Sequence, residues 1–231
     1  MGSFAEIEER AEKRKGGAAA LKTLMPKLPD VDVLRAQADD RLLSEMTRYV
    51  FYAGFVRNVI DSKWPGFEAA FSGFDPAFLN LAPDDYWHDL TSDTRIVRNG
   101  AKIMSVRANA QFIRQLADEH GSAGQFFADW PIEDHIGLLG VLDKRAERLG
   151  GMSGQYFLRA IGRDSFVMSH DVLVCLRLSG LPISEGKPTK KDLRLIQDRF
   201  NAWHADTGLP LTHLSRICAF SVGMPGEEDE A

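Results

Sequence analysis

Cysteines and long apolar runs are scarce in this sequence, and each shortage excludes a class of protein. Only two cysteines occur among 231 residues, Cys175 and Cys218. They are too few for a disulfide framework or a four-cysteine zinc site, and their apolar neighbours predict buried thiols. No apolar stretch approaches the ~20 residues that span a bilayer. The charged first residues lack the apolar region of a secretory signal, so we expect a soluble, cytoplasmic protein of bacterial type.

Basic charge is also limited, but it is unevenly distributed. The net charge of −5 argues against nonspecific affinity for nucleic acid, because Lys and Arg drive binding to phosphates. Residues 141–217, however, hold 12 Lys and Arg against 8 Asp and Glu. The acidic residues 226–231 predict a disordered tail. Any contact with nucleic acid is therefore expected in the basic region.

Alternation of period two is scarce, whereas apolar residues recur every three or four positions, as in amphipathic helices. The clearest series are Leu42, Met46, Val50 and Ala53; Ile103, Val106, Ala110 and Ile113; and Leu193, Ile196, Phe200 and Trp203. A last helix is expected over 213–221, and Asp84 and Thr189 are expected to cap helix starts. The sequence predicts an all-α bundle of roughly nine to eleven short helices.

A glycine cluster at the start of the basic region offers a phosphate site. Gly150, Gly151 and Gly154 precede a predicted helix over 155–161. The first backbone N–H groups of a helix lack partners within it and carry positive partial charge, so a glycine loop before them can hold phosphate. The alternative is a turn between two helices with glycine at a C-cap.

Two groups of motifs resemble known DNA glycosylases. Residues 149–157, LGGMSGQYF, resemble the hairpin of the helix-hairpin-helix DNA glycosylases, with Gly for Pro, Ser for the second Gly, and Tyr-Phe for Thr-Ala. Residues 67–71 (FEAAF), 74–76 (FDP) and 94–103 (TRIVRNGAKI), continuing to Asn109-Ala110, are similar to DNA-3-methyladenine glycosylase I. The resemblance runs from about residue 42 to 178 and leaves the first 35 residues uncovered.

The resemblance implies a helix-hairpin-helix glycosylase-like domain over 31–225, after an N-terminal helical extension (1–30) and before the tail (226–231). It implies a monofunctional hydrolase of base excision repair that flips and removes alkylated purines, such as 3-methyladenine. Its partner would be double-stranded DNA with a damaged base. The protein would be associated with the nucleoid. No membrane, obligate protein partner or cofactor is expected. The family's zinc site uses Cys and His near both ends, and no Cys precedes Cys175, so no metal is expected either.

The resemblance and the basic neighbourhood together nominate the DNA contacts. The lyase members of the superfamily have a nucleophilic Lys where this chain has Gln155, which implies that the backbone is not cut. Lys190, Lys191 and Arg194 are close in the sequence and could contact the DNA backbone. The alternative is that all three lie on a solvated face. The expected DNA-binding residues are Gly150, Gly151, Met152, Ser153, Gly154, Gln155, His170, Lys190 and Lys191.

Asp171 is the expected catalytic residue. The superfamily places one Asp at the start of the helix that follows the hairpin helix, and Asp171-Val172-Leu173-Val174 is similar to that pattern. Loss of a purine leaves an oxocarbenium-like sugar, which a carboxylate can stabilise while it orients or deprotonates water. The alternative is an ordinary N-cap, since Asp directly precedes an apolar helical run.

The expected base pocket is aromatic, because an extruded base needs stacking surfaces. Its residues are Tyr49, Tyr52, Phe55, Arg57 and Trp64; the alternative is that the aromatics are core. DNA-3-methyladenine glycosylase I has a pocket Glu and a pocket Trp where this chain has Tyr49 and Arg57. That departure keeps two other functions open: a helix-hairpin-helix DNA-binding protein without activity, and an all-α structural protein without a nucleic-acid partner.

Overall fold

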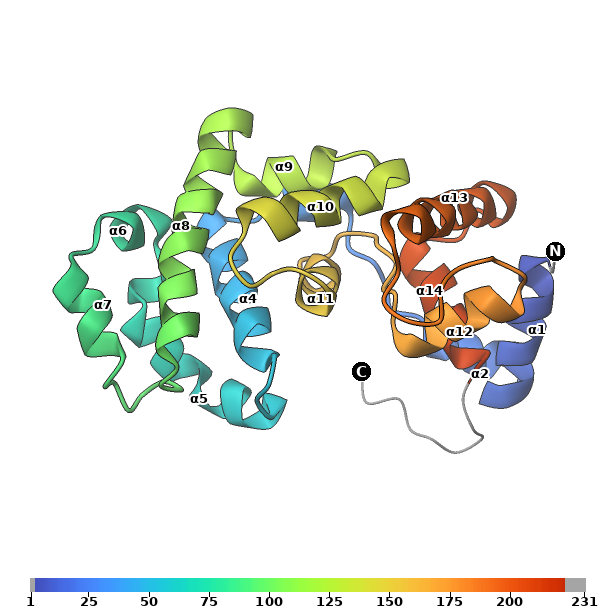
Figure 1. The fold of residues 1–231 in the computed structure, drawn as a ribbon, viewed down its shortest axis with the longest axis horizontal. Helices are drawn as coiled ribbons and strands as arrows, with labels where there is room; N and C mark the ends of the chain where they lie inside the picture. The colour runs from blue at the N-terminus through green and yellow to red at the C-terminus, as the bar shows by residue number, and fades with distance from the viewer. Residues whose placement is uncertain (1–2, 223–231) are drawn as a thin grey trace. The chain divides into compact units, whose positions relative to one another are not determined.

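The structure, a computed structural model, describes residues 3–222, and every regular element in that range is a helix (Figure 1). The predicted all-α class is confirmed. The fourteen α-helices within 3–222 exceed the nine to eleven expected, because five of them have only five to seven residues, too short for an apolar period to show. The acidic tail 226–231 lies outside the described residues.

The elements, in chain order, are α1 (Phe4–Lys15), α2 (Ala18–Thr23), α3 (Val31–Arg35), α4 (Asp39–Tyr52), α5 (Arg57–Ala70), η1 (Ser72–Phe74), α6 (Pro76–Leu81), α7 (Asp84–Leu90), α8 (Gly100–His120), α9 (Ala123–Asp129), η2 (Ile132–Asp134), α10 (His135–Arg145), α11 (Met152–Ala160), α12 (His170–Leu178), α13 (Lys190–Thr207) and α14 (Leu211–Phe220). No helix within residues 3–222 combines the length and the apolar character needed to cross a bilayer.

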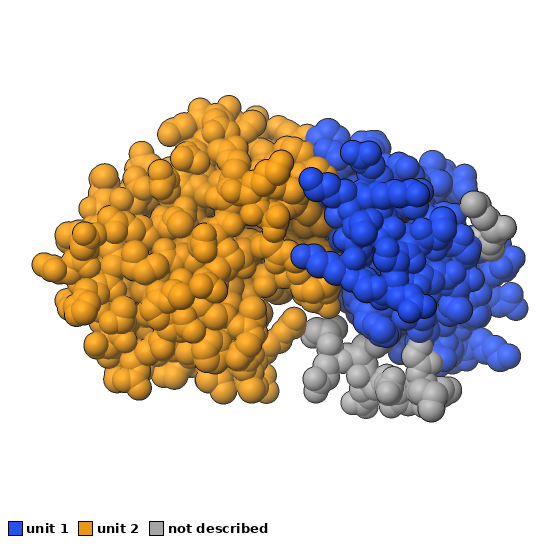
Figure 2. Space-filling view, in the orientation of Figure 1, with its two compact units in different colours: residues 1–28, 131–136, 164–231 blue, residues 29–130, 137–163 orange. Residues whose placement is uncertain are grey.

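The chain forms two compact units, coloured separately in Figure 2. Unit 1 comprises residues 1–28, 131–136 and 164–231, and unit 2 comprises residues 29–130 and 137–163. The N-terminal helices therefore belong to the same unit as the C-terminal ones. Arg14 Nε donates to the carbonyl oxygen of Phe220 at 3.1 Å, which ties α1 to α14.

In unit 2 the long helix α8 lies beside α4 (Figure 1). The predicted apolar series of α8 is buried throughout, from Ile103 to Ile113. That of α4 is buried at Leu42, Met46 and Val50, but Ala53 is exposed because the helix has already ended at Tyr52. Burial of these residues removes apolar surface from water and stabilises the pair of helices. At α7 the expected cap was wrong: Asp84 is the first helical residue, and Pro83 precedes it.

In unit 1 the helices α12, α13 and α14 enclose a core that contains both cysteines, which are buried as predicted. Phe166 and Phe200 stack with their ring centroids 4.3 Å apart. Thr189 caps α13 as predicted, and its Oγ1 accepts from the backbone N–H of Asp192. The last helix begins at Leu211, two residues earlier than expected, because the carboxylate of Asp164 accepts from the N–H groups of residues 211 and 212.

Candidate functional site

The glycine cluster forms a sharp turn that joins α10 to α11 in unit 2. Gly151 has φ 62° and ψ −133°, a combination that side chains other than hydrogen disfavour. A Cβ at Gly154 would collide with the carbonyl oxygen of Leu149, so only glycine lets the first turn of α11 approach the turn this closely. Leu149 itself is buried and anchors the turn in the core. We call residues 146–155 the hairpin.

The hairpin is held from behind by Asn109 of α8. The Asn109 Nδ2 donates to the carbonyl oxygen of Glu147 at 3.1 Å, and the N–H of Glu147 donates to the Asn109 Oδ1 at 2.7 Å. Gln155 adds a second brace, because its Nε2 donates to the carbonyl oxygen of Gly151 at 3.3 Å and its side chain is buried. The sequence motif contained Asn109, but nothing local revealed its contact with a residue 38 positions away.

The start of α11 is exposed at Gly151 and Met152. No side chain in the described part of the chain caps this helix start. Lys144 and Arg148 are also exposed, whereas Arg145 pairs with Glu119 at 2.8 Å. An uncapped helix start carries positive partial charge and can bind an anion, although a carboxylate oxygen of Asp143 lies beside Gly150.

Asp171 lies in unit 1, in the first turn of α12. The cap of this helix is Ser169, whose Oγ accepts from the N–H of Val172 at 3.4 Å, so the alternative that Asp171 is the cap is wrong. The Asp171 side chain is half-buried, and no hydrogen bond or ion pair within residues 3–222 engages its carboxylate. The neighbouring His170 is exposed, as are Lys190, Lys191 and Arg194 of α13.

An aromatic cluster in unit 2 contains three of the predicted pocket residues. Tyr49 meets Tyr52 edge to face, with ring centroids 5.3 Å apart. The guanidinium of Arg57 lies over the ring of Tyr52 at 5.1 Å and over the ring of Tyr156 at 5.8 Å. Tyr156, on the hairpin helix α11, was not predicted as a site residue. Its only signal was that Tyr156-Phe157 replaces the usual Thr-Ala of the hairpin motif.

Acidic groups stand beside this cluster. The hydroxyl of Tyr52 donates to Asp61 at 2.5 Å, and burial together with this bond raises the pKa of Tyr52 to about 12. Burial also raises the pKa of Glu45, one helical turn before Tyr49, although the positive charge of Arg48 opposes the shift. Arg48 Nε is 3.4 Å from the Glu45 carboxylate. Neither acid was predicted, although the four-residue spacing from Glu45 to Tyr49 places both on one helix face.

Trp64 and Phe55 differ from the other predicted pocket residues. Trp64 is buried, stacks on Phe67 with centroids 5.0 Å apart, and carries the guanidinium of Arg48 at 4.3 Å from its ring. These contacts make it part of the core. Phe55 is 36% exposed, and its ring centroid lies 5.1 Å from Lys102 Nζ. That ammonium donates to the Val50 carbonyl oxygen at 2.5 Å at the end of α4, and burial lowers its pKa.

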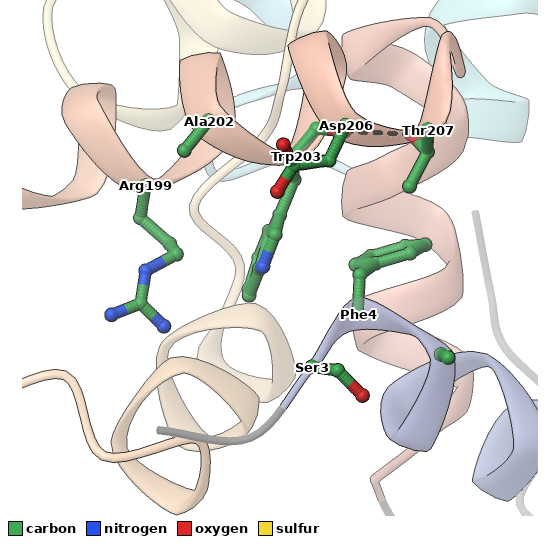
Figure 3. A pocket seen from close by; sticks show the side chains of 8 residues that line it. Ser3, Phe4, Arg199, Ala202, Trp203, Asp206 and Thr207 are labelled. Carbon is green, nitrogen blue, oxygen red and sulfur yellow. Dashed lines mark hydrogen bonds between the residues drawn. The ribbon is translucent and has the colours of Figure 1, made fainter.

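Other features of the surface lie away from the predicted residues. A hollow of about 360 Å³ in unit 1 has the rings of Phe4 and Trp203 on its wall, with centroids 5.2 Å apart, and Arg199 and Asp206 beside them (Figure 3). None of the predicted site residues line it. Within residues 3–222, no three His, Cys, Asp or Glu side chains are grouped so that they could hold a metal ion.

Comparison with known proteins gives a family match and a fold. Residues 34–136 match the methyladenine glycosylase family, a segment that includes the aromatic residues of α4 and α5 but not the hairpin or Asp171. No curated protein sequence matches the chain.

Solved structures of DNA glycosylases are similar to this chain. The 8-oxoguanine DNA glycosylase of Methanocaldococcus jannaschii has a TM-score of 0.55 at 11% identity, over 94% of this chain and 95% of its own. The same archaeal enzyme in complex with a 15mer DNA containing 8-oxoguanine has 0.49 at 13%, over 93% and 96%. A 3-methyladenine DNA glycosylase I has 0.49 at 19%, over 62% of this chain and 86% of its own.

Proposed function

We propose that this chain, which carries the fold of the helix-hairpin-helix DNA glycosylases, is a monofunctional DNA glycosylase that removes alkylated purines in base excision repair. The family match over residues 34–136 supports the chemistry of a glycosylase. The observation that carries the proposal is the carboxylate of Asp171, which is half-buried at the start of α12, is not the helix cap, and is engaged by no residue that the structure describes.

The hairpin would hold the DNA backbone. The exposed, uncapped start of α11 can donate its first N–H groups to a phosphate oxygen, and such contacts position a protein on DNA without reading its sequence. Lys190, Lys191 and His170, the further DNA contacts expected in unit 1, are exposed, as are Lys144 and Arg148 in unit 2. The buried side chain of Gln155 supports the turn from inside, so the backbone amides make the contact.

Asp171 would promote hydrolysis. The bond between C1′ of the sugar and the purine nitrogen breaks, and its electron pair leaves with the base. A water oxygen then bonds to C1′, and the proton of that water passes to Asp171 or to solvent. The carboxylate stabilises the cationic sugar and orients the water. Gln155, at the position of the lyase Lys, has an amide that cannot form a Schiff base, so we infer that no strand cleavage accompanies base removal.

Tyr49, Tyr52 and Phe55 are the proposed stacking surfaces for the extruded purine. Tyr49 and Tyr52 are half-buried on α4, and Phe55 is exposed on the turn after it. Trp64, by contrast, is buried in the core. Alkylation that leaves a purine cationic weakens its glycosidic bond. Such a base leaves readily, so the pocket does not need a strong acid to protonate the leaving group.

Base release from defined duplexes tests the proposal. Duplexes with one 3-methyladenine or one 7-methylguanine are incubated with the wild type, with Asp171→Asn, and with Asp198→Asn as a matched loss of an exposed acid in unit 1. We expect Asp171→Asn to slow release by about 100-fold or more while duplex binding is kept, and Asp198→Asn to release base normally. An Asp171→Asn protein as fast as the wild type would contradict the assignment.

The second candidate is a helix-hairpin-helix DNA-binding protein without chemistry. It is favoured by Tyr49 and Arg57, which replace the pocket Glu and Trp of the family that the chain resembles. Salt-sensitive duplex binding by the wild type, with no base released from any lesion tested, would select this candidate.

A further inference from the structure

The guanidinium of Arg57 lies within about 6 Å of two tyrosine rings that come from different helices. It lies over the faces of Tyr52, on α4, and Tyr156, on the hairpin helix α11. We infer that Tyr52 and Tyr156 form a clamp for the extruded base, and that Arg57 is an internal ligand of this clamp which the base must displace. The inference rests on the proposed function, because only an enzyme that extrudes nucleotides presents a base to these rings.

Arg57 is suited to be displaced. A guanidinium is planar and cationic and stacks on aromatic faces as a base does. The side chain is exposed, and no carboxylate within residues 3–222 pairs with it. Arg48 is the contrast: it stacks on Trp64, lies 3.4 Å from Glu45 and 3.8 Å from Asp61, and is therefore fixed. Removal of Arg57 from the rings breaks no ion pair.

The two rings are positioned in different ways. Tyr52 is held by its hydrogen bond to Asp61 at 2.5 Å and by its edge-to-face contact with Tyr49. Tyr156 is set by α11, whose first turn is the proposed phosphate site. At 1.5 Å per residue, Tyr156 is only about 6 Å along the helix axis from Met152. A nucleic acid gripped by the hairpin amides is therefore one helical turn from the clamp.

An internal ligand lowers the apparent affinity for every base by one factor. If only a fraction of the molecules have an empty clamp, the apparent dissociation constant of any ligand rises by the inverse of that fraction. The factor does not depend on which base binds. Competition from Arg57 therefore raises the apparent dissociation constant of every base, and weakly stacking bases no longer bind measurably. The rings themselves determine which base binds best.

Equilibrium dialysis of two nucleosides with the full chain tests the inference. The probes are guanosine and 7-methylguanosine, at a pH below the pKa of the methylated ring N1–H, where the second probe is a cation. Exposed contacts between a guanidinium and two rings predict that Arg57→Gln binds both probes about fivefold more tightly. The matched variant Arg107→Gln removes a guanidinium that pairs with Asp84 at 2.8 Å, and its affinities should not change.

The outcomes separate this inference from the proposed function. Equal gains for both probes support the internal ligand, whether or not the chain releases bases from DNA. A fall in affinity, no change, a gain for one probe only, or no measurable binding in any variant overturns it, even if base release is observed. Tyr156→Leu provides a second check: it should weaken binding of both probes, and it should remove the gain when combined with Arg57→Gln.

Discussion

The brace between Asn109 and the hairpin yields the most direct prediction. Asn109→Ala removes two hydrogen bonds to the backbone of Glu147 and leaves an N–H and a carbonyl group without partners. Asn109 is fully buried, and each orphaned buried group costs about 1–3 kcal/mol. Glu147 is exposed and water can reach its backbone, so we expect the lower end, about 2 kcal/mol of unfolding free energy in total.

Urea unfolding and duplex binding measure this effect. The midpoint of Asn109→Ala should fall without a change in the slope of free energy against urea, and its affinity for undamaged duplex should fall too, because the hairpin amides are no longer held in place. Asn201→Ala is the matched control in unit 1: it removes the bond from Nδ2 to the carbonyl oxygen of Glu133 and the bond that Oδ1 accepts from Gln197 Nε2, both 2.9 Å, and should leave duplex affinity intact. A wild-type midpoint for Asn109→Ala would refute the brace. A lowered midpoint with wild-type affinity would refute the hairpin as the DNA contact.

Two further predictions concern the turn and the tyrosines. Gly154→Ala forces a Cβ onto the Leu149 carbonyl oxygen, and such overpacking should lower the free energy of unfolding by about 1–3 kcal/mol and weaken duplex binding. Gly140→Ala, at an open position of α10, should have neither effect. Equal urea midpoints for the two variants would count against the steric argument. Tyr52 keeps its proton more tightly in the folded protein, with the pKa raised from 10.0 to about 12, so its contribution to stability is complete below pH 10 and is lost as the pH rises to about 12. Tyr52→Phe should flatten the fall in urea midpoint over that window, and an unchanged fall would contradict the assigned hydrogen bond.

The sequence was sufficient for the parts of the fold that repeat a pattern. The series of α8 and α13 span several turns, so their periodicity is clear, and Thr189 has the local signature of a capping box. Short helices such as α3, with five residues, have no period to detect. At α12 and α7 the acids Asp171 and Asp84 resembled caps, but Ser169 and Pro83 precede those helices, because an acid in the first turn also suits the helix dipole.

The match of residues 34–136 to the methyladenine glycosylase family supports the resemblance in that segment, but much of the candidate site lay beyond the sequence. Tyr49, Tyr52 and Arg57 fall within a short stretch, so their proximity followed from helical spacing. Tyr156 is about a hundred residues further on, and its approach to Arg57 depends on how α11 packs against α4. The brace by Asn109 likewise joins segments that share no local pattern. Spacing identifies the face of one helix, whereas partners from distant segments depend on tertiary packing.

The arrangement of segments in the two units has a consequence for biosynthesis. Residues 29–163 contain all of unit 2, so the hairpin and the tyrosine cluster can fold as soon as that stretch has left the ribosome. Unit 1 combines α1 and α2 with α12 to α14. The first helices to be synthesised therefore cannot pack in their unit until the last ones have been made. The portion proposed to bind phosphate is therefore completed on the ribosome before the portion that bears Asp171, the proposed catalytic residue.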